Sequence, residues 1–166
     1  MKSRTPLARA AASVVLAVAL LAGTAGCTFI SRQATLIQYD PSNGVGASVG
    51  DVKVRNAIAL INEDGTAVSL LITLVNSGQD DVSVKLQYEA NGKKLTEIKA
   101  VPAGGVSSFG NVDGEDQIVV TNPGVKSGAL MPVYVQYGDN PGSELMVPVL
   151  PAEGAYEGLG PVVNEG

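Results

Sequence analysis

Histidine and tryptophan are absent from the 166 residues, and cysteine occurs once, as Cys27. Ser-His-Asp and Cys-His catalytic systems move a proton through an imidazole near neutral pH, so hydrolases of these usual types are excluded. Structural zinc and iron–sulfur sites need several thiolates or imidazoles, which this chain does not offer. Because one cysteine cannot form an internal disulfide, the fold must rest on its apolar core.

Aromatic residues are also few, with two Phe and five Tyr. The core must therefore be built from Val, Leu and Ile, a composition that favours extended strands. The start of the chain has no acidic residue, and there Lys2, Arg4 and Arg9 precede an uncharged run over residues 10–22. This is the basic and then apolar pattern of an export signal. The run is too short to cross a bilayer core of about 30 Å.

Three small residues, Thr24, Ala25 and Gly26, stand directly before Cys27. They resemble the lipobox of bacterial lipoproteins, in which the cysteine thiol receives a diacylglyceryl group and becomes the mature N-terminus. The resemblance implies that residues 1–26 are a lipoprotein signal peptide and that the protein is lipid-anchored on the extracytoplasmic face of the cell membrane. The alternative is an ordinary signal-peptidase site, which would leave Cys27 as a free thiol or remove it.

The charge of the remaining chain is strongly acidic. Removal of residues 1–26 takes three of the 11 basic residues and no acid, which leaves eight Lys and Arg against 16 Asp and Glu, a formal net charge of −8. Nucleic-acid phosphates and anionic lipid surfaces would repel such a chain, so we expect neither as an electrostatic partner. Membrane attachment would then depend on covalent lipid at Cys27.

Period-two alternation is clearest at Val82–Glu89, and the Asn91-Gly92 pair that follows is typical of a tight hairpin turn. The same reading predicts strands over 52–61, 66–76, 82–89, 93–101, 106–111, 117–121, 130–137 and 144–150. Short strands separated by turns predict an all-β, antiparallel immunoglobulin-like or cupredoxin-like sandwich of about seven to eight strands over residues 49–150. A small barrel is the alternative. We expect residues 27–48 to form a lipidated N-terminus and flexible tether, and residues 151–166, rich in Pro, Gly and Glu, to be disordered.

Carboxylates and thioethers are the candidate metal ligands that this chain offers. Asp113 and Glu115 lie in a glycine-containing turn and could supply part of a calcium shell, but their spacing does not match a complete calcium loop and a solvated turn explains them better. Met131 and Met146 lie on two predicted strands and could offer soft ligands to Cu(I), although methionines more often fill gaps in a core. We therefore predict no catalytic residue, no cofactor and no metal site.

Three segments resemble the LpqE-type lipoproteins of actinobacteria: Tyr39–Val45, Val49–Ala57 and Leu70–Gly78. The similarity runs over most of residues 33–150. It implies a secreted, lipid-anchored envelope protein with an immunoglobulin-like or cupredoxin-like sandwich and no established enzymatic activity. It also implies a distant relation to PCuAC-type copper chaperones, which bind copper through paired histidines and methionines. Since this chain has no histidine, the resemblance carries over the fold and not the copper site.

Three function classes follow. The first is a non-enzymatic, lipid-anchored β-sandwich that acts as an interaction or assembly module for an envelope protein of unknown identity. The second is a carrier of a metal, such as copper, or of a small ligand, derived from a PCuAC-like scaffold. The third is a carboxylate-dependent enzyme such as a glycosidase, which would need two acids roughly 5 to 10 Å apart in a concave pocket.

Overall fold

Residues 10–17, 42–110 and 116–163 are described by the computed structural model. The chain divides into two units, Met1–Tyr39 and Asp40–Gly166. The described part of the first unit is a helix over 10–17 with exposed residues. No helix within the described ranges is both long and apolar enough to cross a membrane. The predicted signal-peptide junction, Thr24 to Cys27, lies outside the described residues.

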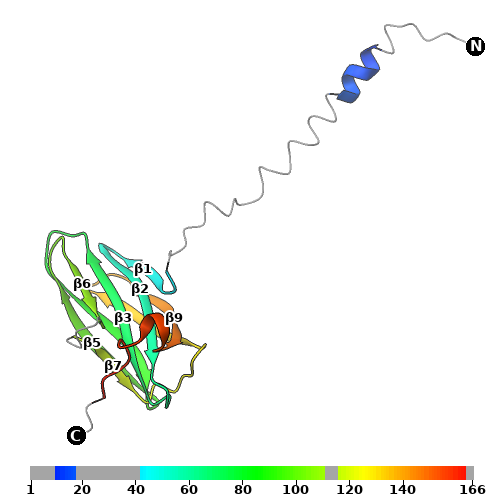
Figure 1. Cartoon of the computed structure of the whole chain (residues 1–166). Coiled ribbons are helices and arrows are strands. Elements are labelled where there is room, and N and C mark those ends of the chain that lie inside the picture. The colour runs from blue at the N-terminus through cyan, green and yellow to red at the C-terminus, as the bar shows by residue number, and fades with distance from the viewer. Residues whose placement is uncertain (1–9, 18–41, 111–115, 164–166) are drawn as a thin grey trace, which may run out of the picture. The chain divides into compact units, whose positions relative to one another are not determined.

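The second unit contains strands and one short 3-10 helix (Figure 1). The strands are β1 (Val45–Val49), β2 (Val52–Ile61), β3 (Ala67–Asn76), β4 (Val82–Ala90), β5 (Lys93–Val101), β6 (Val106–Phe109), β7 (Ile118–Thr121), β8 (Leu130–Tyr137) and β9 (Ser143–Pro151), and the helix is η2 (Gly154–Tyr156). Alternation of apolar and polar residues explains most of them, because β4 and β8 bury every second side chain. The prediction of an all-β fold is confirmed.

All nine strands belong to one curled sheet in the order β5-β4-β8-β9-β2-β3-β6, with β1 paired to β2 and β7 paired to β3. The curl brings β4, β5, β8 and most of β9 to face the layer of β1, β2, β3, β6 and β7. Two findings differ from the predicted antiparallel sandwich of seven to eight strands. There is one additional strand, β1, and the end of β9 runs parallel to β2, with Ala59 opposite Val149. A parallel pair arises because β9 continues past β8 into the second layer.

A bulge at Asn56 divides β2 into two halves. Asn56 has a φ of 50°, and the register of β2 against β3 shifts between Arg55 and Ile58. One extra residue in a strand moves the following side chains to the opposite face. The core-facing positions therefore change from Val54 before the bulge to Ala57 after it. As a result, Ile58 and Leu60 lie on the outer face, where they are nevertheless buried.

The segment after β9 covers this outer face, and we call residues 152–163 the C-terminal strap. The Ala152 N–H donates to the Ile61 carbonyl at 3.2 Å. The side chain of Gln117 donates to the Gly160 carbonyl and accepts from the Val162 N–H, both at 3.1 Å. Figure 1 shows η2 in front of the sheet near β3 and β9. The expectation of disorder therefore does not hold for residues 151–163, because these hydrogen bonds fix a Pro- and Gly-rich segment that composition alone would leave unfolded.

The start of the domain also differs from expectation. β1 pairs with β2 through Val49 opposite Val52, so residues 45–48, which were expected to belong to the tether, are part of the sheet. Val49 packs in the core with the inward residues of both layers. The sequence of β1 predicts a strand only weakly, because Val-Gly-Ala-Ser-Val contains only two β-branched residues.

Candidate functional site

A cleft opens where β4 and β8 separate. The two strands pair from Val84 opposite Tyr137 to Gln87 opposite Tyr134. Both strands extend further, β4 to Ala90 and β8 back to Leu130, without pairing to each other there. Pro132 lies in the separated part of β8 and has no N–H to donate to a ladder. A proline in an interior strand thus explains locally why the sheet opens at this place.

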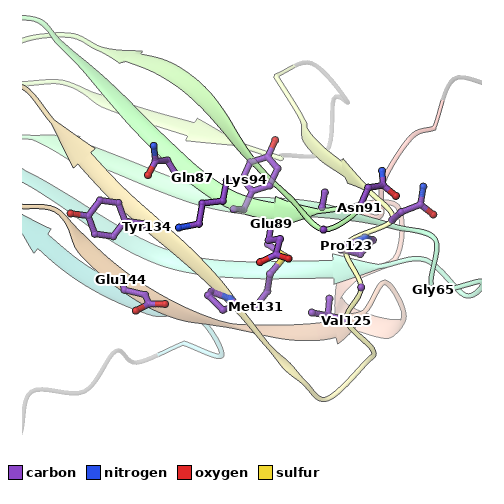
Figure 2. A pocket seen from close by; sticks show the side chains of 16 residues that line it. Gly65, Gln87, Glu89, Asn91, Lys94, Pro123, Val125, Met131, Tyr134 and Glu144 are labelled. Atoms are coloured by element: carbon purple, nitrogen blue, oxygen red, sulfur yellow. The ribbon is translucent and has the colours of Figure 1, made fainter.

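The cleft has a volume of about 1050 Å³, at the upper end of the range for small-molecule sites. Its end wall is made by three turns, at Gly65, at Asn91 and Gly92, and at Asn122 to Val125. The backbone N–H of Asn91 donates to the Asn122 carbonyl at 3.1 Å and joins two of these turns. The remaining lining residues come from β4, β5, β8 and β9 (Figure 2).

One end of the cleft has an apolar base next to the turns that contain Asn91 and Asn122. Met131 and Tyr88 line it although both are core residues, and Met131 is only 1% exposed. Figure 2 shows Met131, Pro123 and Val125 together at this end. The pKa of Tyr88 is raised, first because burial disfavours the phenolate and second because of the negative charge of Glu97. Tyr88 therefore keeps its hydroxyl proton at neutral pH and adds no charge to the cleft.

The other end is formed by Tyr134 and Glu144, which lie opposite each other in the β8–β9 register. Figure 2 shows both at the end of the cleft away from Val125. The Tyr134 ring packs on Gly142 so closely that a Cβ at Gly142 would overlap the ring and hydroxyl. The glycine thus leaves room for the ring and fixes its position. This contact gives the cleft a positioned aromatic surface.

Charges at the rim are unevenly distributed. Glu89 and Lys94 are cross-strand partners on the outer face of β4 and β5, so their opposite charges offset each other. Glu144 has no basic cross-strand partner, since it lies opposite Tyr134. No salt bridge joins Glu89, Lys94 or Glu144 to another described residue. The lining therefore carries a net charge of −1, contributed by Glu144.

The two candidate methionine ligands lie on opposite faces of one layer. Met131 is opposite Val147 and Met146 is opposite Pro132, so the two side chains occupy successive positions with opposite orientation. Met131 is 1% exposed and Met146 is 45% exposed. One ion cannot contact both. Asp113 and Glu115 lie outside the described residues. The described part of the chain contains no group of three or more Cys, Asp or Glu residues placed to hold a metal ion.

Tyr134 and Tyr137 lie on opposite faces of β8, because their separation is odd, and are 40% and 9% exposed. The sequence alone did not predict the cleft or its residues Glu144, Lys94 and Glu89. One local signal was present. Pro132 lies within β8, an interior strand of the sheet, where a proline has no N–H to offer a neighbouring strand.

No protein-family model matches this chain, and no curated protein matches it. Its fold is similar to that of solved structures. The apo PCuAC domain of PmoF2 is 13% identical, with a TM-score of 0.51, over 66% of this chain and 98% of that one. The copper-bound PCuAC domain from PmoF2 is 14% identical with a TM-score of 0.48, over 64% and 98%. Exo-chitosanase CsxA of Amycolatopsis orientalis is 16% identical with a TM-score of 0.34, over 60% and 13%.

The first of these similarities defines the class of scaffold, a PCuAC-like β-sandwich. At 13% identity it extends to the fold alone.

Proposed function

We propose that this protein is a non-enzymatic carrier of a small organic ligand in the cell envelope and that the ligand occupies the cleft between β4 and β8. The observation that carries the proposal is the cleft itself. It has a volume of about 1050 Å³ and reaches the buried side chain of Met131 through a gap in a sheet. Concave sites with an apolar base and a few polar groups are the usual form of small-ligand sites. The PCuAC-like scaffold supports a carrier over an assembly module.

Copper is a weaker candidate than an organic ligand. The chain contains no histidine, and Met131 and Met146 lie on opposite faces of their layer. A single thioether provides too few ligands for a specific Cu(I) site. Equilibrium dialysis with Cu(I) tests this choice. Stoichiometric, submicromolar binding that is lost in the Met131→Leu variant would replace the organic ligand with copper.

An enzymatic role for the cleft has less support. Glu89 and Glu144 both line it, as a carboxylate-dependent enzyme would require. A glycosidase holds its general acid in an apolar environment. Both of these carboxylates are exposed. We therefore propose binding without turnover.

A neutral fluorescent probe, N-phenyl-1-naphthylamine, tests the cleft. Val125→Trp fills the apolar end, and Val106→Trp is the matched control, because Val106 is exposed on β6 and does not line the cleft. We expect Val125→Trp to weaken probe binding by about tenfold or more, since one bulky side chain displaces apolar contacts worth over 1 kcal/mol. Equal affinities in the two variants, or no binding to the unmodified domain, would overturn the proposal.

One specific observation supports the alternative function, an interaction or assembly module. Leu130 and Met146 are large apolar side chains exposed on the outer face of β8 and β9. Exposed apolar residues that cluster often mark protein contacts. A photo-crosslinking residue at position 146, compared with one at the exposed turn residue Asp64, tests it in the native envelope. Capture of one partner from position 146 alone would support an assembly role.

A further inference from the structure

We propose that the cleft selects an amphipathic organic cation, with its apolar group against Met131 and its ammonium group between Tyr134 and Glu144. The inference rests on the proposed function, because it assigns a chemical class to the ligand of the same cleft. It goes further by stating the sign of the ligand's charge, its orientation and its length.

The charge of the cleft favours a cation. Glu89 and Lys94 offset each other as cross-strand neighbours, and Glu144 supplies the net negative charge. The chain after residue 26 has a formal charge of −8. Such a domain raises the local concentration of cations and repels anions. An anionic ligand would find only Lys94, whose charge Glu89 already offsets.

Tyr134 provides the second element of cation recognition. Its ring is held against Gly142 and is 40% exposed. Glu144 is its direct cross-strand neighbour, and such neighbours have Cβ atoms about 4.5 to 5.5 Å apart. An ammonium group over the ring could therefore also meet the carboxylate. Aromatic faces attract cations, and quaternary ammonium ligands are commonly bound in this way.

The distance between the two ends sets the length of the ligand. Tyr134 and Met131 are three residues apart on β8, which is about 10 Å along a strand. Their side chains leave opposite faces of β8, so the ligand would pass from the outer face to Met131 through the gap beside Pro132. A phenyl ring joined to an ammonium group by four methylenes spans about this distance. The apolar end, with Met131, Pro123 and Val125, would accept the ring.

Three probes of similar shape test the inference: 4-phenylbutylammonium, 4-phenylbutanol and 5-phenylpentanoate. Their affinities for the full-length protein are measured by NMR titration at low ionic strength. We expect the ammonium to bind about tenfold more tightly than the alcohol, and the carboxylate to bind most weakly. Glu144→Gln should remove the advantage of the ammonium. Glu153→Gln, an exposed site on the strap, should preserve it.

Two further variants separate the ring from the charge. Tyr134→Leu keeps apolar contact and should weaken only the ammonium, whereas Tyr134→Phe keeps the aromatic face and should bind it as before. Lys94→Gln removes a repelling charge from the rim and should strengthen ammonium binding.

The outcomes distinguish the two proposals. If the alcohol binds as tightly as the ammonium and Val125→Trp weakens both, the inferred charge is wrong and the carrier proposal stands. An ammonium advantage that persists in Glu144→Gln would also overturn the inference. If Val125→Trp changes the binding of none of the probes, the cleft is not the site and the proposed function itself fails.

Discussion

The hydroxyl oxygen of Tyr137, near the end of β8, accepts a hydrogen bond of 2.8 Å from the backbone N–H of Asp51 in the turn between β1 and β2. The contact joins the two layers of the sandwich. Gly50, with a φ of 54°, lies so close to this hydroxyl that a Cβ would overlap it. The turn therefore depends on both the glycine and the phenol.

Removal of that hydroxyl should reduce stability by a modest amount. We expect Tyr137→Phe to lower the free energy of unfolding by about 1 kcal/mol, because the Asp51 N–H loses its partner. Urea denaturation followed by circular dichroism measures the change. Tyr134→Phe is the matched control, since no hydrogen bond of the Tyr134 hydroxyl is found within the described residues. Equal losses in both variants would contradict the role of the contact.

Asn76 should be among the residues most sensitive to substitution. Its buried side chain donates to the carbonyls of Asp80, Val101 and Pro102 at 2.8 to 3.3 Å. Asp at this position cannot donate these bonds and would bury a charge, so we expect Asn76→Asp to cost about 2 to 4 kcal/mol. Asn62→Asp, at an exposed turn, should cost less than about 1 kcal/mol in the same denaturation experiment. A small loss at Asn76 would show that these bonds are not important for stability.

Ionisation of Tyr88 should make the free energy of unfolding depend on pH in the alkaline range. Burial and Glu97 raise its pKa in the folded state above the ordinary value of 10.0. The unfolded chain then loses this proton first, so the contribution of Tyr88 is fully present below about pH 10 and is lost as pH rises through the folded pKa. We expect the difference in unfolding free energy between the unmodified protein and Tyr88→Phe to change only above about pH 10. A difference that does not vary up to pH 11 would contradict this.

The last part of the strap should loosen when Gln117 is shortened. Gln117→Ala removes both hydrogen bonds to Gly160 and Val162, so we expect faster amide hydrogen exchange over residues 156–163. The outer-face residues Ile58 and Leu60 should become more accessible. Gln87→Ala, which removes a hydrogen bond to Thr96 on the other layer, is the control. Unchanged exchange in Gln117→Ala would mean that the strap is held by other contacts.

Membrane attachment remains a prediction from the sequence. We expect Cys27→Ala to release the protein from membranes without a change in its thermal unfolding, because residue 27 precedes the first strand. Fractionation after a high-salt wash, with immunodetection, measures the release. Cys27→Ala protein that stays in the membrane fraction would contradict a covalent lipid anchor.

Strands could be predicted from local pattern to within a few residues. β2, β5 and β8 begin and end at the predicted residues, because alternation and turn residues define both ends. The parallel pairing of β9 with β2 could not be predicted in this way. Alternation shows which face of a strand is buried and does not identify its neighbour.

The cleft and the strap were missed for related reasons. The cleft depends on where two strands stop pairing, and Pro132 was its one local sign. The strap is held by hydrogen bonds to distant parts of the chain, between Gln117 and both Gly160 and Val162, between Asn43 and Tyr156, and between Ala152 and Ile61. A Pro- and Gly-rich segment that is ordered by distant hydrogen bonds has the same composition as a disordered one.

β9 pairs with β8 through Ser143 to Pro148 and with β2 through Val149 to Pro151. The last strand of the sheet therefore connects the two layers, and it pairs Ala59 with Val149, which are 90 residues apart in the chain. Contacts so distant in sequence carry a high loop-closure entropy and slow folding. Either layer can begin to form during synthesis. The pairing of β9 with β2, which connects the two layers, can form only after residue 151 has left the ribosome. Chains that end before Ser143 should therefore remain open to proteolysis.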